Sequence, residues 1–440
     1  MGNMNHKKSV GVIGLGFVGL PLALTFAMKG VRTVGVDTNE QLIAELNELK
    51  SHHVESYNGK TLRTILIEAT GANNFTATCD YRQAASECDR YIVTVGIPVN
   101  NKEPFYEYFN SALISLAKVL KKGDLVLIRS TVPPGTTLKL ALPLLEQFSG
   151  LQAGDDFYLA YASERIAEGK AFEEFINMPT VLAGYDQESY VQAKQLLSLI
   201  SEAPIHQGSS IAVVETAKVF ENVARDVNIA LANQFAEFTR AIDIDINEVV
   251  ALANTHKRVN LLSPGPGVGG YCLPNAYYYL TPIIHEQRVE LPLLELARNL
   301  NDCVPVKIVE QLDEMLTKQG KTLSEASIAV YGLAMKDYSN DDRISPAHFI
   351  CQLLINHGAD VYAHDPLVAT DKNYEYLNPD AYDVAEKTDA ILILTKQHAF
   401  ENLDFNRIYQ SMNDRPILID TRNLTKREQM EALGYDYYAI

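Results

Sequence analysis

A glycine-rich turn between two apolar segments constrains the fold of this chain more than any other feature. Residues 9–15 form a continuous apolar run, which is typical of a strand buried on both faces. Three glycines with GxGxxG spacing follow it: Gly14, Gly16 and Gly19. Residues 20–29 are apolar and predict a helix, and a second apolar run over residues 31–36 ends at Asp37. This order of strand, glycine turn, helix, strand and acid predicts a dinucleotide-binding unit.

The chemistry of this turn favours NAD as the dinucleotide. The backbone amides of the turn, which includes Phe17 and Val18, and the N-terminus of the following helix would face the pyrophosphate. Asp37 would accept hydrogen bonds from the adenosine ribose, and its negative charge would repel the additional phosphate of NADP. A glycine-bearing turn in an unrelated α/β domain is the alternative, and it explains the position of the acid less well.

Further apolar segments alternate with helical ones and predict more strands of the same sheet: residues 90–95, 124–129, 158–161 and 179–183. In a parallel sheet, ligands bind at the carboxyl ends of the strands, where polar loops follow these segments. Thr131 and Glu164 lie in two of those loops, so we expect both at the cofactor edge. Either residue could instead cap a helix.

Residues 210–243 contain no proline or glycine, and their apolar residues recur at helical spacing. They predict one long helix that serves as a spine between domains, and residues 291–318 predict another helix. Lys218 and Asn222 lie four residues apart and therefore share a face of the long helix. Their apolar neighbours indicate a largely buried helix, and a solvated polar pair is the alternative.

A loop over residues 264–274, called the cysteine loop below, leads to a single cysteine, Cys272. Its glycines, among them Gly265, Gly267 and Gly269, permit close approach of a ligand to the main chain, while three prolines restrict the backbone. A thiol in such a loop is a candidate nucleophile. A buried cysteine beside a tight turn is the alternative interpretation.

A second α/β unit begins near residue 320. Four apolar segments predict its parallel strands: residues 327–336, 361–366, 390–395 and 416–420. The unit lacks a full GxGxxG pattern, so it suits a different nucleotide better than a second dinucleotide. Lys336, Arg343 and Arg422 are candidate phosphate ligands, and a surface charge at a strand end is the alternative for each.

Composition limits the classes of partner. The 38 basic and 55 acidic residues give a formal charge of −17, which argues against nucleic acid or an anionic membrane as the main partner. The five cysteines form no CxxC pair, so we expect a reduced, cytoplasmic protein without a structural zinc or other metal site. Residues 10–28 are uncharged and imitate a signal peptide or membrane span, but their glycines and Pro21 favour a buried strand and helix.

Together these patterns predict an α/β protein with two Rossmann-like, doubly wound parallel-sheet domains joined by a long central helix. We place an N-terminal NAD-binding domain at residues 1–205. A central helical and dimerisation domain with the cysteine loop follows at 206–318, and a C-terminal Rossmann-like domain follows at 319–440.

Six segments together resemble the UDP-glucose/GDP-mannose dehydrogenase family over nearly the whole chain. They are GLGFVGLPLA (14–23), STVPPGTT (130–137), SERIAEG (163–169), ETAKVFENVARDVNIALANQ (215–234), PGPGVGGYC (264–272) and GLAMKDYSNDDRISPA (332–347). Residues 253–272 are most similar to the branch that acts on UDP-N-acetylhexosamines, particularly UDP-N-acetylmannosamine 6-dehydrogenases. The resemblance implies an NAD-dependent, four-electron oxidation of a UDP-hexose C6 hydroxyl to the uronic acid, feeding polysaccharide or glycoconjugate synthesis.

The resemblance also implies roles for the candidate residues. Cys272 would form a thiohemiacetal with the C6 aldehyde and then a thioester. Lys218 would stabilise oxyanions, and Asn222 would hold the same oxygen or a water. Glu164 would be the acid–base carboxylate, and Thr131 would position water.

The same resemblance implies a UDP-sugar held by the C-terminal domain and by residues around the cysteine loop. Its predicted contacts are Glu164, Arg165, Lys218, Asn222, Arg258, Gly265, Gly267, Gly269, Lys336 and Arg422. The predicted contacts of the cofactor include Thr131, Arg343 and Lys336, and of these three Lys336 is also a predicted substrate contact. Arg258 resembles a substrate-binding arginine that reaches a neighbouring subunit's site, which implies a homodimer.

Ala276 departs from the family pattern, which usually has an aspartate four residues after the cysteine. This departure leaves open an altered outcome, either a two-electron oxidation or a persistent thioester. Two smaller departures are Tyr271, where the branch often has histidine, and the TVGIP sequence at residues 94–98.

Two other classes of function remain open. A simple hydroxyacid dehydrogenase would use the lysine–asparagine pair of the long helix but would need neither Cys272 nor the C-terminal unit. A non-catalytic sugar-nucleotide sensor would bind a UDP-sugar without reducing NAD.

Overall fold

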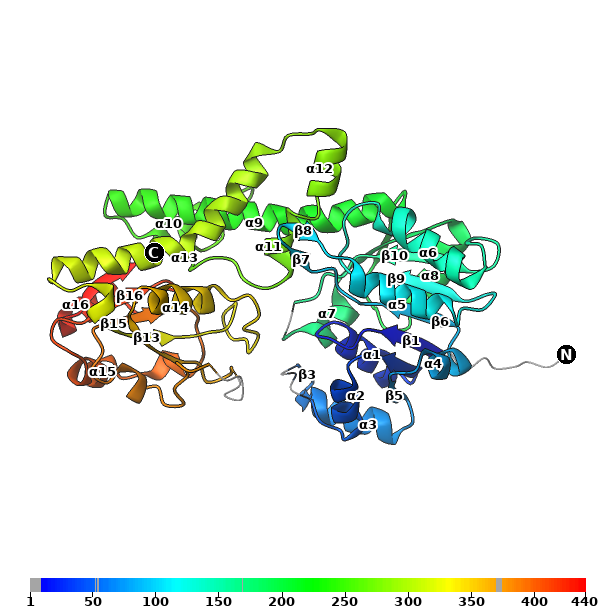
Figure 1. Cartoon of the computed structure of the whole chain (residues 1–440), viewed down its shortest axis with the longest axis horizontal. Coiled ribbons are helices and arrows are strands. Elements are labelled where there is room, and N and C mark those ends of the chain that lie inside the picture. Colours follow the sequence, from blue (N-terminus) through cyan, green and yellow to red (C-terminus); the bar gives the residue numbers. More distant parts are fainter. Residues whose placement is uncertain (1–8, 52, 54, 168, 369–373) are drawn as a thin grey trace. The chain divides into compact units, whose positions relative to one another are not determined.

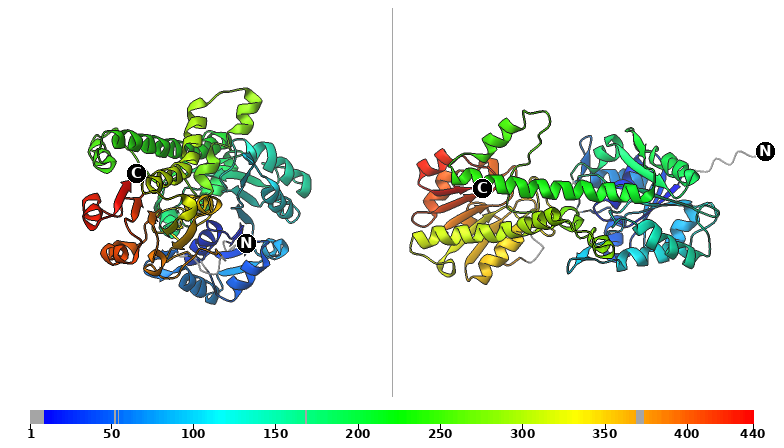
Figure 2. Two further views of the ribbon diagram at one scale, coloured as in Figure 1. Left: turned by 60° about the vertical axis from the view of Figure 1, so that its left-hand side comes forward. Right: turned by 90° about the horizontal axis from the view of Figure 1, so that it is seen from above.

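The computed structural model describes residues 9–51, 53, 55–167, 169–368 and 374–440. The chain divides into two compact units, Met1–Glu221 with Tyr278–Val289 and Asn222–Tyr277 with Glu290–Ile440 (Figure 1). One helix of 31 residues, α9 (Ile211–Ala241), is shared by both units and runs without interruption (Figure 2). The division into three domains remains a prediction.

The first unit is built on a mixed sheet. Among the described residues, eight strands pair in the order β12-β11-β10-β9-β6-β1-β2-β5. Their bounds are β1 (Ser9–Ile13), β2 (Arg32–Val36), β5 (Phe75–Thr78), β6 (Arg90–Val93), β9 (Leu125–Ile128), β10 (Tyr158–Ala162), β11 (Thr180–Gly184) and β12 (Ile205–Gln207). Two small hairpins are formed by β3 (Ser56–Tyr57) with β4 (Lys60–Thr61) and by β7 (Val99–Asn100) with β8 (Glu103–Pro104).

The helices of this unit are α1 (Gly19–Met28), α2 (Glu40–Asn47), α3 (Leu62–Gly71), α4 (Tyr81–Glu87), α5 (Glu107–Ala117), α6 (Leu142–Ser149), α7 (Ala171–Asn177), α8 (Gln187–Leu197) and α12 (Thr281–Gln287). Helices α1 to α8 lie between strands in the chain, as an α/β fold requires, whereas α12 follows the last strand of this unit. The predicted α/β class is confirmed. One detail differs, because β11 pairs antiparallel with β10, and β12 pairs parallel with β11.

Steric contact fixes the glycine turn. β1 is buried along its whole length between β2 and β6. Gly14 follows with φ of 92°, and a Cβ on Gly19 would lie only 1.8 Å from the Gly14 carbonyl oxygen. Position 19 therefore accepts only glycine at this approach. Nine of the ten residues of α1 are buried, so the segment that imitates a membrane span is a buried strand and helix, as predicted.

The second unit is a doubly wound parallel sheet. Among the described residues its five strands pair in the order β14-β13-β15-β16-β17. They are β13 (Ser327–Tyr331), β14 (Asp360–His364), β15 (Ala390–Ile393), β16 (Ile417–Asp420) and β17 (Asp436–Ala439). Its helices, beyond the second part of α9, are α10 (Ile246–Ala253), α11 (Cys272–Ala276), α13 (Pro292–Lys318), α14 (Pro346–Asn356), α15 (Phe405–Ser411) and α16 (Arg427–Leu433). Separate apolar clusters pack on the two faces of this sheet.

Both units use an acid after the second strand in the same way. Asp37 Oδ2 accepts a hydrogen bond from Leu15 N at 2.7 Å, and Asp365 Oδ2 accepts one from Leu333 N at 2.8 Å. Asp37 is partly exposed, whereas Asp365 is buried and also accepts from Gln397 Nε2. The second acid is enclosed by protein, which favours different nucleotides for the two units.

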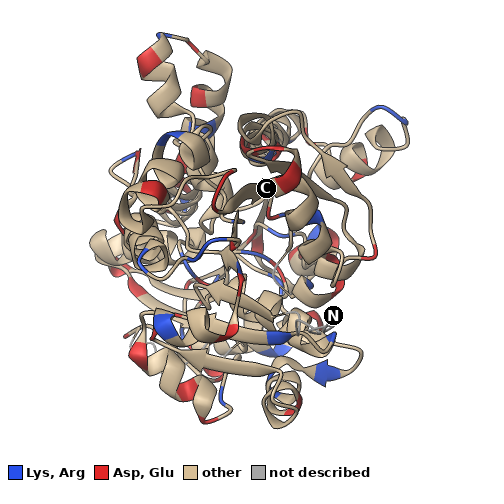
Figure 3. Cartoon of the chain, turned by 90° about the vertical axis from the view of Figure 1, so that its right-hand side faces the viewer, with Lys and Arg blue, Asp and Glu red and all other residues tan. Residues whose placement is uncertain are grey.

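Charged residues of both signs are spread over the described part of the chain. Acidic and basic residues are interspersed over helices and loops (Figure 3). Within the described residues, the structure contains no helix whose length and apolar content would let it cross a membrane.

Substitutions of two turn glycines should separate folding from dinucleotide binding. Gly19→Ala drives a methyl group into a backbone oxygen, so we expect the free energy of unfolding to fall by about 2 kcal/mol or more. A Cβ on Gly16 would meet no heavy atom within 4 Å. Gly16→Ala should therefore change the unfolding free energy by less than about 0.5 kcal/mol and should weaken NAD binding, because its backbone is predicted to face the pyrophosphate. Urea unfolding and NAD titration calorimetry measure both effects, and equal losses of stability would contradict this account.

Candidate active site

The glycine turn of the first unit is open where a dinucleotide would lie. Gly16 is exposed, with no protein atom within 4 Å of the position of a Cβ. Phe17 and Val18 are partly buried, and the rings of Phe17 and His53 lie 4.8 Å apart. Asp37 is fixed beside the turn by its hydrogen bond from the backbone. These residues fit NAD, with the turn available to the pyrophosphate and the acid available to a ribose.

A buried carboxylate from α9 holds the loop that follows β9. The two oxygens of Glu215 accept hydrogen bonds from Gly135 N at 2.6 Å and Thr137 N at 2.8 Å. Burial raises the pKa of Glu215 above its ordinary value. Thr131 lies half-buried in the same loop, at the carboxyl end of β9. Sequence analysis did not identify Glu215, whose backbone partners are 80 and 78 residues away.

Glu164 follows β10 and is buried in an ion pair with Arg129. Its Oε2 accepts from Arg129 Nε at 2.6 Å, and its Oε1 accepts from the backbone of Arg165 and Ile166 at 2.6 and 2.9 Å. Arg129 is also buried, with its guanidinium 5.2 Å from the centre of the Phe175 ring. Both carboxylate oxygens are thus engaged by donors, so any proton transfer through Glu164 competes with these bonds.

A second buried carboxylate anchors the far end of the loop that carries Glu164. Glu55 is 1% exposed, and its oxygens accept from Gly169 N at 2.6 Å and Ala171 N at 3.0 Å. The loop after β10 is therefore held at both ends by carboxylates that satisfy backbone N–H groups. Glu55 was not predictable from a local pattern, because its partners lie 114 and 116 residues away.

The predicted catalytic pair of α9 lies in a buried part of the helix. Lys218 and Asn222 are 8% and 3% exposed. Glu221 lies beside Lys218, with Nζ and Oε2 3.9 Å apart, and it also pairs with Arg165, with Nη2 and Oε1 2.6 Å apart. Arg165, a predicted substrate ligand, is thus tied to α9. Glu221 was not among the residues predicted from the sequence, although residues three apart are neighbours on a helix and its spacing from Lys218 was a usable signal.

In the second unit, Cys272 begins the short helix α11 and is exposed. Asn222 Nδ2 donates a long hydrogen bond, 3.5 Å, to the Cys272 carbonyl oxygen. The structure therefore brings two predicted catalytic residues into contact and does not bury the cysteine in a hydrocarbon core. Ala276, at the other end of α11, is fully buried.

The glycines of the cysteine loop allow it to pack closely on other segments of the second unit. A Cβ on Gly269 would lie 2.8 Å from Met335 Cβ, and Gly267 has φ of 129°. A Cβ on Gly265 would lie 2.4 Å from Nη1 of Arg422. These three glycines, predicted to bind substrate, thus also serve packing within the protein.

Neighbouring aspartates orient the two arginines that were predicted to bind phosphates. Arg422 Nε donates to Asp337 Oδ1 at 2.9 Å, which leaves Nη1 facing the cysteine loop. Arg343 Nε donates to Asp341 Oδ1 at 2.7 Å, and its guanidinium lies 5.2 Å from the centre of the Tyr271 ring. Bidentate carboxylate pairs of this kind fix the plane of a guanidinium.

The two remaining predicted ligands lie in different surroundings of the second unit. Lys336 is half-buried in the loop that follows β13. Arg258 is exposed in the segment after α10. An exposed position suits contact with a second chain.

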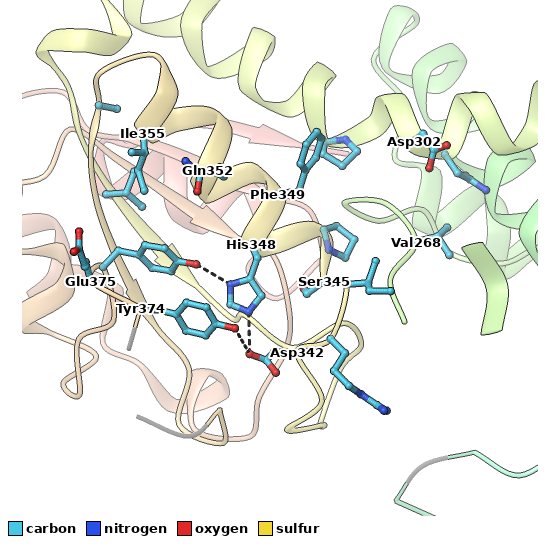
Figure 4. A pocket seen from close by; sticks show the side chains of 18 of the residues that line it. Val268, Asp302, Asp342, Ser345, His348, Phe349, Gln352, Ile355, Tyr374 and Glu375 are labelled. Atoms are coloured by element: carbon cyan, nitrogen blue, oxygen red, sulfur yellow. Dashed lines mark hydrogen bonds and ion pairs between the residues drawn. The ribbon is translucent and has the colours of Figure 1, made fainter. Parts of the chain in front are cut away.

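A cavity of about 1180 Å³ lies beside α14 in the second unit. Helices α13 and α14 and Val268 of the cysteine loop contribute to its wall (Figure 4). There Asp342 accepts a hydrogen bond from Tyr374 at 3.1 Å and shares one with His348 at 3.0 Å. Of the predicted site residues in the described part of the chain, only Arg343 lines this cavity. This cavity is therefore lined mostly by residues that were not predicted to take part in the reaction.

Three family models match successive parts of the chain. The NAD binding domain of the UDP-glucose/GDP-mannose dehydrogenase family matches residues 8–200, its central domain matches 212–303, and its UDP binding domain matches 329–427.

Relatives match over almost the full chain. The UDP-N-acetyl-D-mannosamine dehydrogenase of Pyrococcus horikoshii is 35% identical over 418 residues, covering 95% of this chain and 96% of the relative. The UDP-N-acetyl-D-glucosamine 6-dehydrogenase of Pseudomonas aeruginosa is 33% identical over 426 residues, covering 96% and 98%. The solved structure of the UDP-D-ManNAc dehydrogenase from Pyrococcus horikoshii has a TM-score of 0.90 at 33% identity, covering 98% of this chain and 99% of that chain.

Glu215 should make the stability of the protein depend on pH. Because burial raises its pKa in the folded state, the unfolded chain loses this proton first as the pH rises, and stability falls across that interval. Glu215→Gln removes this contribution, so the variant does not lose this part of the stability as the pH rises. The difference in unfolding free energy, variant minus wild type, should therefore increase between about pH 4 and pH 7. Urea unfolding at both pH values measures the change, and the exposed Glu173→Gln serves as the control. A wild-type-minus-variant difference that stays constant with pH would contradict the prediction.

Proposed function

The chain belongs to the UDP-glucose/GDP-mannose dehydrogenase family, and on that premise we propose that it oxidises the C6 hydroxyl of a UDP-N-acetylhexosamine to the carboxylate. Membership makes it an NAD-dependent UDP-sugar dehydrogenase. The two relatives described above are named for N-acetylhexosamine substrates, which supports the choice of sugar. The observation that carries the proposal is the contact between the buried amide of Asn222 and the exposed residue Cys272.

The chemistry divides between the cofactor and the chain. NAD, bound at the glycine turn, would supply the oxidising power by accepting one hydride from C6 in each of two steps. The Cys272 thiolate would add to the aldehyde carbon and form a thiohemiacetal, and removal of the C6 hydride and the hydroxyl proton would leave a thioester. Water would then attack the thioester carbon, the C–S bond would break, and the thiolate would leave with the acid released.

The residues of α9 would stabilise the charge that develops on the sugar oxygen. The Lys218 ammonium would hold each oxyanion, and Asn222 would hold the same oxygen or a water without titrating. Glu164 and Thr131 stand at the carboxyl edge of the first sheet and would serve as the acid–base carboxylate and as a water-positioning hydroxyl. The three donors on Glu164 favour a fixed carboxylate that takes a proton only transiently.

The second unit would bind the uridine diphosphate, in keeping with its match to a UDP binding domain. We propose Arg422 and Lys336 as phosphate ligands, with Gly265, Gly267 and Gly269 presenting the backbone to the sugar. Arg165 would complete the substrate contacts, and Arg343 and Lys336 would also contact the cofactor. On this proposal residues 1–205, 206–318 and 319–440 form the NAD, central and UDP-sugar domains.

We also propose that the active form is a homodimer, with Arg258 contributed to the site of the partner subunit. The exposed surface of α9 and α10 carries large apolar side chains, including Phe235, Phe238 and Leu252, with Phe238 and Leu252 64–65% exposed. Large exposed apolar side chains that gather on neighbouring helices favour a protein–protein interface on that surface.

A second outcome at the same site is favoured by Ala276. Its fully buried methyl group provides no carboxylate to assist water at this end of α11. The thioester could therefore persist on Cys272, and the measured product would be an adduct instead of a free acid.

A panel of UDP-sugars with NAD tests the proposal directly. We expect two NADH for each free uronic acid formed from one of the UDP-N-acetylhexosamines, and we expect Cys272→Ser to form no free acid because the thioester is lost. Absorbance at the NADH band and mass spectrometry of the sugar nucleotide measure the ratio. A stable adduct on Cys272 in the intact protein would establish the second outcome, and no turnover with any UDP-sugar would remove the first.

A further inference from the structure

Glu221 lies between two cations that were assigned to the site, Lys218 and Arg165. We propose that Glu221 is a positioning residue that keeps the Lys218 amine protonated and fixes its direction on α9. The catalytic meaning of this role rests on the function proposed above. The contact itself belongs to the first unit and can be tested without turnover.

The helix places the two charges side by side. Lys218 and Glu221 are three residues apart on α9, and Nζ lies 3.9 Å from Oε2. Only 8% of Lys218 is exposed. A buried ammonium loses much of its hydration, so a nearby negative charge is required to keep the protonated form favourable.

Arg165 prevents the Glu221 carboxylate from turning away. Its Nη2 lies 2.6 Å from Glu221 Oε1, and its Nε donates to Oε2 at 3.2 Å. Its remaining nitrogen, Nη1, donates to the Pro179 carbonyl at 3.0 Å, just before β11. The Arg165 guanidinium is therefore held by Glu221 on one side and by the Pro179 carbonyl on the other. Because it binds both oxygens of Glu221, it fixes the orientation of that carboxylate.

Two other buried carboxylates of the first unit, Glu215 and Glu164, accept hydrogen bonds from other groups. Glu215 accepts from two backbone N–H groups of the loop after β9, and Glu164 accepts from Arg129 and from two N–H groups of its own loop. The buried phenol of Tyr161 feels the charges of Glu215, Glu164 and Glu221, and it stays protonated because burial raises its pKa. Of these three carboxylates, Glu221 is the one at ion-pair distance from the Lys218 amine.

Removal of the Glu221 charge should act on Lys218 in two ways. The ammonium loses the opposite charge of Glu221, while the positive charge of the Arg165 guanidinium remains. A larger fraction of Lys218 becomes neutral at a given pH, and the ammonium that remains loses its fixed direction on α9, which is the larger cost for an oxyanion that must be held in one place. Turnover should fall while substrate binding, which involves many other contacts, changes little.

Three variants separate this role from a structural one. Glu221→Gln keeps the shape and one acceptor for Arg165 but removes the charge, and Glu221→Asp keeps the charge. Glu174→Gln is the matched control, because Glu174 accepts from Ala167 N in the same loop without contact to the amine. The first readout is the rate at which an amine-acylating reagent modifies Lys218 at about pH 8, followed by peptide mass spectrometry. The second readout is kcat and KM with the UDP-sugar and NAD.

We expect Lys218 in Glu221→Gln to be acylated about tenfold faster than in wild type, and in the other two variants at close to the wild-type rate. We expect kcat to fall about tenfold in Glu221→Gln with KM within about twofold, and Glu221→Asp to recover most of the loss. Unchanged acylation in Glu221→Gln would overturn the inference, and so would an equal increase in Glu174→Gln, which would indicate a loosened loop. If wild type oxidises no UDP-sugar, the proposed function fails, and the acylation rates still decide the role of Glu221.

Discussion

Four polar residues lie within about two turns of α9, and three of them contact segments outside that helix. Glu215 holds the loop after β9, Glu221 holds Arg165 of the loop after β10, and Asn222 contacts the residue that begins α11. Lys218 lies between them on the same helix. Because a helix advances about 1.5 Å per residue, these groups keep fixed spacings whatever the loops themselves prefer. In the first unit, the loops that carry Thr131 and Arg165 are thereby fixed to a helix, and a helix positions side chains more precisely than a loop does.

The loops at the carboxyl edge of the first sheet are fixed mainly by carboxylates that accept backbone N–H groups. Glu55 and Glu164 do so for the loop after β10, and Glu215 does so for the loop after β9. Loops have no ladder partners of their own, so a buried N–H group needs an acceptor from elsewhere. Of these three carboxylates, only Glu164 was predicted from the sequence to be catalytic. In this structure their carboxylate oxygens accept hydrogen bonds from backbone N–H groups of the loops. A carboxylate engaged in this way is less available to take up a proton, so fewer residues remain as candidates for the acid–base group.

The sequence predicts the first strand–turn–helix unit well, because its glycine spacing records a local steric contact. Gly19 is required by a carbonyl only five residues away, and Asp37 is recognisable by its place after an apolar strand. The direction of β11 was not predictable in this way, since an apolar strand has the same composition whichever way it runs. Glu55 and Glu215 were missed for a related reason: their partners lie about 80 residues or more away, and no short motif encodes such a contact. The roles of Cys272, Lys218 and the phosphate ligands remain predictions.

The cysteine loop shows why glycine patterns alone are poor evidence for ligand contact. Gly269 is required by Met335, and Gly267 has a backbone angle that favours glycine, so both have reasons in the fold itself. Gly265 differs, because the atom nearest to its absent Cβ is Nη1 of Arg422, at the flexible end of a long side chain. A side chain at position 265 could displace that guanidinium without breaking the backbone packing. Among these glycines, Gly265 is therefore the position where a sensitivity to substitution would report on Arg422, a proposed phosphate ligand, more than on the fold.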